Sequence, residues 1–296
     1  MSKNRFNNLL HLNIERRNLI TSKSFFLRLI SNLDMIIQTI FCFLLRKLNS
    51  HVMLRTKTFW GKNMKIVLPE VISSEIRRFG YFEEKVAFFI INNCSNGDTV
   101  IDIGSHYGFF ALLMSDLVGD NGAVHCFEPT PSTFSILKKN TKLNKNIVIN
   151  RMAILEKNIQ IELNDYGISS SAFNSINKAR LKINKKQLGK NKIKVEAIKL
   201  DDYVIFNNLR PSLIKIDAES SEYEVIKGMD YVLKEIKPNL CVELGDFGIE
   251  GVLPSREIVN LLTRKYGYTV YEMINSKLIP HYLQEKYNYT NLFFKQ

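Results

Sequence analysis

The chain has 296 residues, of which 45% are hydrophobic and 24% are charged, and it contains 19 Phe and 12 Tyr. This composition is typical of a folded globular protein and excludes general disorder, because the aromatic side chains offer enough apolar surface to form a core. The net charge is +12, and residues 1–60 contribute +8 of it. The attraction for an anionic partner is therefore concentrated in the N-terminal segment.

The N-terminal segment combines this positive charge with a short apolar stretch. Met35–Leu45 is too short to span a bilayer, but together with Phe25–Leu33 it predicts an amphipathic helix flanked by Arg46 and Lys47. Such a helix can pack on the rest of the protein, form a homodimer contact or lie on a membrane surface. The pattern favours packing or a homodimer contact over peripheral membrane contact through residues 1–60.

Two further features bear on the compartment and the division of the chain. The first residues lack the apolar core and cleavage site of a signal peptide, and the four cysteines are far apart, without the C-x-x-C spacing of zinc or redox sites. We therefore expect a cytoplasmic protein, with the inner membrane surface as the alternative location. We divide the chain into a basic, mostly helical N-terminal extension, residues 1–70, and one larger domain, residues 71–296.

From Thr99 onward, short apolar strands alternate with helical patterns, which is the signature of a mostly parallel sheet with helices on both faces. The sequence therefore predicts an α/β fold, a three-layer Rossmann-like sandwich with a seven-stranded sheet. Thr130 and Pro131 are expected to open one helix, and a capping box of Ser221 and Glu224 another. The predicted strands are 99–104, 123–128, 147–154, 212–220, 239–245, 269–274 and 291–296, and two of the predicted helices are 109–118 and 255–266.

One part of this region departs from the alternation. A strand pattern over 158–164 is followed by a Ser- and Asn-rich stretch, and residues 178–194 contain eight basic residues and no acid. Strand character resumes over 194–203. We interpret 158–198 as an antiparallel excursion with a basic loop close to the ligand-binding face, and we expect it to contribute, with the 246–254 loop, to the choice of substrate.

The strongest local signal is the segment VIDIGSHYG from Val100 to Gly108. A buried strand ends at Gly104, where the absence of a side chain permits a tight turn and the close approach of a ligand, and a helix with free N-terminal N–H groups starts near Gly108. Asp102 can accept a hydrogen bond from a ligand amine or orient the loop. The D-x-G-x-x-x-G spacing differs from the G-x-G-x-x-G of dinucleotide sites, which favours a nucleoside ligand and disfavours an NAD-dependent oxidoreductase.

Glu128 ends the second predicted strand, 24 positions after Gly104. A carboxylate at that place can accept hydrogen bonds from both ribose hydroxyls of a nucleoside. The segment after the third strand would then border the base, with Met152 and Ala153 as candidate contacts. A glycine turn and an acid at this spacing indicate a nucleoside site much more specifically together than either does alone.

Four segments carry a resemblance to a known family: IDIGSHYGFFALLMSDLVGDNGAVHCFEPTPSTFSILKKNTKLN, KLDDY, LIKIDAESSEYEVIKG and PNLCVEL. They follow one another between Thr99 and Leu244, and together they resemble the FkbM-type methyltransferases. The resemblance implies a class I methyltransferase fold, S-adenosylmethionine as the methyl donor, and O-methylation of a sugar or polyketide-type hydroxyl.

The resemblance also assigns roles to residues that match the family's motifs. The matches to its cofactor-binding positions are Asp102, Gly104, Gly108 and Glu128, and those to its acidic pair after the fourth strand are Asp217 and Glu219. With the neighbouring candidates added, the predicted cofactor-binding residues are Asp102, Gly104, Ser105, His106, Gly108, Glu128, Met152 and Ala153.

Two positions depart from the family's pattern. Ser105-His106 stands where Ala-Asn is usual, which changes the contact to the methionine end of the cofactor. Ser220 stands where Gly is usual, which narrows the freedom of the backbone beside the active site. Neither departure removes a carboxylate, so we expect a change of substrate rather than a loss of activity.

Methyl transfer from a sulfonium to a hydroxyl is an in-line displacement, which needs positioning and a base that takes the hydroxyl proton. The C-terminal ends of the fourth and fifth strands are expected to face the methyl group. The candidate catalytic residues there are Asp217, which we favour as the base, Glu219, and Glu243, whose alternative role is a local structural hydrogen bond. His106 is expected to shape the pocket. Asp217 and Glu243 permit a divalent cation, but without a dedicated ligand cluster we expect no metal.

Two other functions remain open from the sequence. The basic loop is compatible with a nucleic-acid methyltransferase, but it lacks interleaved aromatic residues for base stacking, and the N/D-P-P-Y/F-like motif of amino-group methylation is absent. Nucleic acid is therefore not the expected partner. A degenerate methyltransferase that acts as a scaffold through residues 1–60 is disfavoured by the intact glycine turn. We expect a hydroxylated small molecule or glycan as the methyl acceptor.

Overall fold

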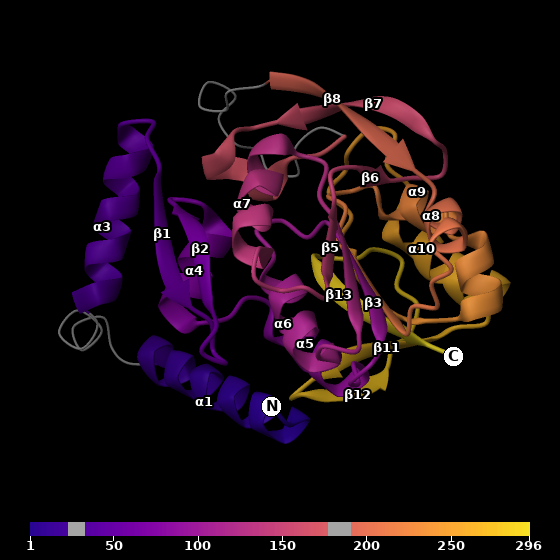
Figure 1. The fold of residues 1–296 in the computed structure, drawn as a ribbon, viewed down its shortest axis with the longest axis horizontal. Coiled ribbons are helices and arrows are strands. Elements are labelled where there is room, and N and C mark those ends of the chain that lie inside the picture. Colours follow the sequence, from indigo (N-terminus) through magenta and orange to yellow (C-terminus); the bar gives the residue numbers. More distant parts are fainter. Residues whose placement is uncertain (23–32, 177–190) are drawn as a thin grey trace.

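The computed structural model of the chain describes residues 1–22, 33–176 and 191–296. Most of the predicted basic loop, 178–194, and nearly all of the predicted helical stretch Phe25–Leu33 lie outside the described residues. Figure 1 shows a central sheet with helices on both of its sides, and the N-terminal helices and a hairpin at one end of the molecule.

Among the described residues, the central sheet has eight strands in the order β12-β11-β13-β10-β9-β3-β4-β5. The strands β5, β4, β3, β9 and β10 run parallel to one another, whereas β13 is antiparallel to its two neighbours, β10 and β11. The prediction of a mostly parallel sheet is confirmed. The strands are β3 (Thr99–Ile103), β4 (Ala123–Phe127), β5 (Ile147–Asn150), β9 (Leu213–Ile216), β10 (Asn239–Leu244), β11 (Thr269–Ile274), β12 (Lys277–Pro280) and β13 (Thr290–Lys295).

The predicted number of seven strands is too small by one, because β12 extends the sheet as a short edge strand. Asn275 and Ser276 connect it to β11 with φ angles of 48° and 61°, the left-handed conformations of a two-residue hairpin turn. The strand has four residues, begins with Lys277 and ends with Pro280, so it carries no apolar strand pattern. Proline is tolerated there because the strand lies at the edge of the sheet.

Two predicted strands are shorter in the structure. β9 stops at Ile216, so the acidic residues that follow it form a turn. The predicted strand over 194–203 ends at Ile198, and Leu200–Phe206 forms the helix α8 instead. Asp201 and Asp202 lie in the first turn of α8, where negative charge stabilises a helix through its dipole.

The excursion between β5 and β9 forms a separate three-stranded sheet. β7 (Ile159–Asp165) and β8 (Asn191–Ile198) pair antiparallel, as predicted for 158–198, and β6 (Ala153–Ile154) pairs parallel with β8. The predicted third strand, 147–154, is therefore divided between the two sheets. A short 3₁₀ turn, η1 (Ile168–Phe173), follows β7.

Helices cover both faces of the central sheet, as expected for a three-layer sandwich. One buried cluster joins strand residues such as Val100 and Cys126 to one helical layer, and a second joins Ile101 and Phe127 to the other. Neighbouring residues of one strand thus face opposite layers. The first layer contains α5 (Glu84–Asn93), α6 (Phe109–Val118) and α7 (Pro131–Thr141), and the second contains α8, α9 (Glu222–Lys227) and α10 (Ser255–Asn260), which continues as a π-helical turn over Leu261–Lys265.

The N-terminal region contains more than helices. The helices α1 (Lys3–Ser22) and α3 (Leu33–Lys47) are followed by a hairpin of β1 (Val52–Lys57) and β2 (Asn63–Leu68) and by the helix α4 (Val71–Phe79). Their buried side chains, including Phe6 and Ile66, belong to the same cluster as those of α5 and α6. The division of the chain at residue 70 stays a prediction. Within the described ranges, no helix is long and apolar enough to cross a membrane.

Candidate functional site

The candidate site lies where the C-terminal ends of β3, β4 and β9 meet. These strands are parallel neighbours, so the residues that follow them gather at one edge of the sheet. A pocket, partly open to solvent, is lined there by Gly104, Glu128, Asp217 and Glu219, together with residues of η1 and of the small sheet.

Gly104 forms the turn at the floor of the pocket. Its φ is +76°, and a Cβ atom at this position would lie 1.8 Å from the main-chain oxygen of Asp217. Only glycine fits, because any side chain would meet the neighbouring strand. Gly108 begins α6 with a φ of +90°, and a Cβ there would lie 2.7 Å from Cδ1 of Leu137. Gly104 thus lies at the floor of the pocket. Gly108 does not line the pocket, and its missing side chain permits close packing of α7.

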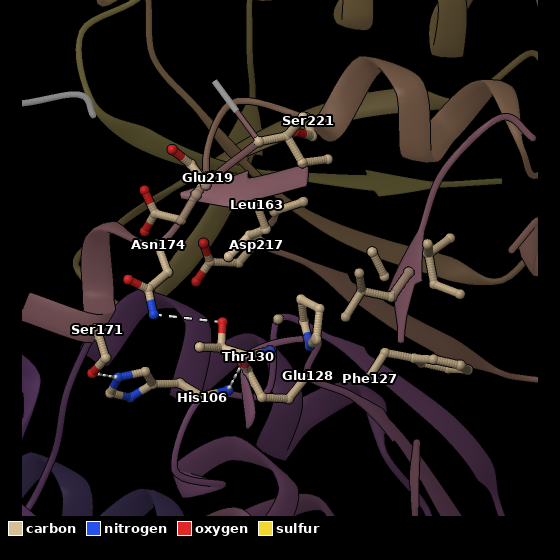
Figure 2. Close-up of a pocket in the computed structure, with 18 of the residues that line it drawn as sticks. His106, Phe127, Glu128, Thr130, Leu163, Ser171, Asn174, Asp217, Glu219 and Ser221 are labelled. Atoms are coloured by element: carbon tan, nitrogen blue, oxygen red, sulfur yellow. Dashed lines mark hydrogen bonds between the residues drawn. The ribbon is translucent and has the colours of Figure 1, made fainter. Parts of the chain in front are cut away.

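Glu128 points into the pocket from the end of β4 (Figure 2). The main-chain N–H groups of Thr130 and His106 donate to its two carboxylate oxygens, at 3.0 and 3.1 Å. Each carboxylate oxygen can accept a further hydrogen bond, so the carboxylate stays competent to bind the ribose hydroxyls that the sequence assigns to it. Burial raises the pKa of Glu128 to about 7.

His106 connects the glycine turn to η1. Its φ is 48°, its Nε2 atom lies 2.9 Å from the hydroxyl oxygen of Ser171, and its ring stacks on that of Tyr107 with the centroids 3.8 Å apart. Burial lowers the pKa of His106 to about 3, so the imidazole is neutral at physiological pH. This geometry agrees with the expectation that His106 shapes the pocket.

The apolar wall of the pocket comes from the start of the small sheet. Met152 and Ala153, the predicted base contacts, both line the pocket, as do Leu155 of the same segment and Leu163 of β7. The wall is therefore suited to the flat apolar faces of an adenine ring.

Asp102 does not line this pocket but lies beneath it. Its side chain is fully buried in β3 and faces the ammonium group of Lys215 on β9 at 3.6 Å. Lys215 also contacts a carboxylate oxygen of Asp217 at 3.2 Å. Burial disfavours the charge on Lys215, but the two carboxylates outweigh this effect and raise the pKa of Lys215. The geometry gives Asp102 a supporting place, as the counter-ion of a buried lysine that in turn holds Asp217.

Ser105 also lies outside the main pocket. Its hydroxyl donates to the main-chain oxygen of Asp102 at 2.8 Å. It lines a smaller neighbouring cavity with Phe82, Lys215 and Asp217. This cavity shares Gly104, His106 and Asp217 with the main pocket.

The ion pair of Lys215 gives a prediction about stability. Lys215→Met leaves Asp102 as a buried carboxylate without its cation, so we expect the free energy of unfolding to fall by about 3–5 kcal/mol. Adding Asp102→Asn removes the unpaired charge and should recover a large part of this loss. Denaturant titration of the two variants and the wild type measures both effects; equal destabilisation of the single and double variants would contradict the pairing.

Three predicted catalytic acids come together beside the pocket: Asp217 and Glu219 line it, whereas Glu243 is buried in β10 next to them and does not. Asp217, Glu219 and Glu243 each offer a carboxylate oxygen, and these oxygens all lie within 4.8 Å of one another. Such a group can accept hydrogen bonds from the hydroxyls of a substrate, and it can also coordinate a divalent cation. The expectation that no ligand cluster exists here is therefore wrong for the described residues, although the prediction that no metal is used stays a prediction.

The turn after β9 has an unusual backbone. Glu219 and Ser220 have φ angles of 49° and 74°, in the left-handed region where glycine is favoured. Ser220, which stands where the family usually has Gly, thus adopts a left-handed backbone conformation that is less favourable for a residue with a side chain. The carboxylate of Glu222 accepts hydrogen bonds from the N–H groups of Ala218 and Ser220. The predicted capping box is not formed, because the side chain of Ser221 makes no cap hydrogen bond.

A fourth carboxylate, missed in the sequence, stands beside these acids. Glu83 precedes α5 with a φ of 47°, and its Oε1 atom accepts hydrogen bonds from the hydroxyl of Tyr289 and the amide of Asn291, the latter at 3.0 Å. Burial raises the pKa of Glu83, the charge of Asp217 adds to this effect, and Lys215 opposes it. Glu83 lies in no motif, so only the tertiary structure reveals it.

A comparison with known families matches residues 102–270 to the Methyltransferase FkbM domain. Among curated proteins, "Methyltransferase 1" of Beauveria bassiana is 26% identical over 163 residues, covering 50% of this chain and 64% of that protein. "Hexuronic acid methyltransferase AglP" of Haloferax volcanii is 27% identical over 158 residues, covering 52% of this chain and 59% of that protein. The chain thus spans about three fifths of the length of each of these relatives.

A comparison with solved structures finds matches at lower identity. The structure of methyltransferase FkbM from Methylobacillus flagellatus KT has a TM-score of 0.42 and 16% identity, covering 67% of this chain and 43% of that chain. A SAM-dependent O-methyltransferase from Thermotoga maritima has a TM-score of 0.41 and 12% identity, covering 82% of this chain and 77% of that chain.

Proposed function

The chain belongs to the FkbM methyltransferase family, whose members use S-adenosylmethionine, and we therefore propose that it transfers a methyl group from this donor to a hydroxyl of a sugar or glycan. One observation carries the proposal. The pocket that contains the glycine turn and Glu128 is also lined by Asp217 and Glu219, so a nucleoside site and groups able to take a proton share one cavity.

The residues of the pocket fit the cofactor. Gly104 lets the turn after β3 lie directly against the main-chain oxygen of Asp217, where a Cβ atom would not fit, and Glu128 presents a carboxylate to the ribose hydroxyls. Met152 and Ala153 offer an apolar wall to adenine. When bound, S-adenosylmethionine supplies an electrophilic methyl carbon on a positively charged sulfur.

The chain's own residues then orient the acceptor and take its proton. The hydroxyl oxygen forms a bond to the methyl carbon while the carbon–sulfur bond breaks, and the hydroxyl proton passes to a carboxylate. We assign this role to Asp217, with Glu219 as the alternative, because Asp217 lines both the main pocket and the cavity beside it. Lys215 fixes the Asp217 carboxylate from below, and Glu243 can bind another hydroxyl of the acceptor.

The acceptor class is supported by two considerations. The name of the Haloferax volcanii relative refers to a hexuronic acid, which favours a sugar. The carboxylates of Glu83, Asp217, Glu219 and Glu243 accept hydrogen bonds from hydroxyl groups but repel an acceptor with its own carboxylate. We therefore propose a sugar whose reacting end is uncharged.

The affinity for S-adenosylmethionine should depend on pH through Glu128. Its pKa is raised to about 7, and ribose hydroxyls donate to the ionised form, so binding favours loss of the proton. We expect the affinity to rise from about pH 6 to about pH 8 and then level off. Glu128→Gln cannot ionise; at the higher pH we expect it to bind more weakly by roughly 1–3 kcal/mol and to show no slope. Calorimetric titration of S-adenosylmethionine and S-adenosylhomocysteine measures both effects.

The same group affects the stability of the protein without cofactor in the opposite direction. Because the folded protein binds this proton more tightly than the unfolded chain, the contribution of Glu128 to stability falls as the pH rises from 4.5 to about 7.

A folded wild type that does not bind either nucleoside would overturn the proposed function and favour a scaffold. Binding, followed by methyl incorporation into oligonucleotides but not into neutral glycosides, would replace the proposed acceptor.

A further inference from the structure

The helix α3 exposes an apolar stripe to solvent. Leu33, Ile37, Ile40 and Leu44 of α3, and Leu48 directly after the helix, follow one another at spacings of three and four, and each is between 47% and 72% exposed. Residues at this spacing lie on one side of a helix. Phe43, which is 63% exposed, lies next to the stripe in the sequence. The apolar side of this helix is therefore not used by the described core.

The opposite side of α3 attaches the helix to the protein. Gln38, Cys42 and Leu45 are buried, and the amide of Gln38 donates to the main-chain oxygen of Ser74 in α4 at 3.2 Å. The guanidinium of Arg46 donates to the main-chain oxygen of Pro69 at 3.0 Å. A helix held in this way keeps a fixed orientation at one end of the molecule (Figure 1), and its apolar stripe is exposed.

An exposed apolar surface of this extent marks an interaction site, and its surroundings indicate the kind of partner. Residues 1–60 carry a net charge of +8. Lys47 ends α3, and Arg55 and Lys57 are exposed on β1, the strand that follows α3 in the chain. Asp34 is the single acid of α3. Apolar residues flanked by basic ones are the composition of helices that lie in the surface of an anionic membrane.

We propose that α3 docks on an anionic lipid surface, with its stripe in the boundary between headgroups and acyl chains. With 15 residues the helix is about 22 Å long, too short to span a bilayer, so it would lie parallel to the membrane. A second copy of the chain is the less suitable occupant, because it would bring two segments of charge +8 together, whereas anionic headgroups carry the complementary charge. The proposal is independent of methyl transfer.

The test is sedimentation of the full chain with lipid vesicles, either of phosphatidylcholine alone or of phosphatidylcholine with phosphatidylglycerol. We expect the wild type to bind the anionic vesicles, and the triple variant Ile37→Ser, Ile40→Ser, Leu44→Ser to bind at least about tenfold more weakly. The charge variant Lys47→Glu, Arg55→Glu, Lys57→Glu should also lose binding. The matched control, Leu143→Ser with Phe206→Ser, removes two side chains that are each 89% exposed elsewhere and should bind like the wild type.

Circular dichroism and thermal melting verify that each variant is folded, and sedimentation equilibrium without lipid gives the oligomeric state. The proposal is overturned if the wild type does not bind anionic vesicles, or if the triple variant and the control lose binding equally. It is also overturned if the wild type is a dimer that the triple variant converts to a monomer, because the stripe would then be a contact between two copies.

Discussion

Replacing Gly104 by alanine should weaken the binding of S-adenosylmethionine by more than about a hundredfold, or close to 3 kcal/mol. The new Cβ atom would lie 1.8 Å from the main-chain oxygen of Asp217, a distance at which the backbone must move. The turn that follows β3 and the start of the acidic turn after β9 would both be displaced, so the cofactor pocket and the acidic edge should be affected together. Calorimetric titration of the folded variant measures the loss.

The chain offers a matched control for this effect. Gly267 has a φ of +73°, close to the +76° of Gly104, but a Cβ atom there would meet no heavy atom within 4 Å. Gly267→Ala should therefore show only the cost of a left-handed alanine, about 1–2 kcal/mol of stability, with unchanged cofactor affinity. If Gly104→Ala binds the cofactor as well as Gly267→Ala does, the glycine turn is not part of the cofactor-binding site.

The second large effect is expected from Asp217→Asn, which keeps the shape of the side chain but removes its ability to take a proton. Turnover should fall by about 10²–10⁴, while the affinity for S-adenosylmethionine changes only a few-fold, because no cofactor contact has been assigned to this carboxylate. The measurement is transfer of a labelled methyl group to the sugar acceptor, with kcat and KM determined separately.

Two neighbouring variants serve as comparisons. Glu219→Gln and Glu243→Gln remove the other acids of the group, and we expect them to raise KM for the acceptor more than they lower kcat, because hydrogen bonds to acceptor hydroxyls contribute to its binding. If Glu219→Gln abolishes turnover while Asp217→Asn retains it, the base is Glu219. If all three variants keep full turnover, the acidic edge is not the catalytic centre.

The fold could largely be predicted because its signals are local. The alternation of apolar strands and helices required a parallel sheet with helices on both faces, and the structure has this arrangement. The predictions of the fold are wrong where tertiary contacts, rather than local sequence, determine which strands pair. The strand β12 has no apolar pattern and exists only as the partner of β11, and Ala153–Ile154 leaves the central sheet to pair with β8, which no local pattern announces.

The candidate site also contains residues that local sequence signals predict and residues that they do not. Gly104, Glu128 and Asp217 follow directly on strands, so the topology of a parallel sheet was enough to bring them together. Asp102 lies one residue before the end of β3, and its side chain faces Lys215 on β9 rather than the pocket. The sequence pattern alone does not show which residues near the end of a strand face the pocket. Glu83 could not be predicted, since its partners are more than 200 positions away.

The position of β13 has a consequence for the order of folding. This strand is the last one described, yet it stands between β10 and β11 in the sheet. During synthesis the strands β3 to β10 can assemble as they emerge, but β11 and β12 can pair only with each other, and they cannot join the rest of the central sheet until Thr290–Lys295 has been made. Tyr289 and Asn291 reach Glu83 by the same insertion. Completion of the sheet and of the acidic edge is therefore expected to be one late, cooperative step, and until then the nascent chain has an open sheet edge that a chaperone could protect.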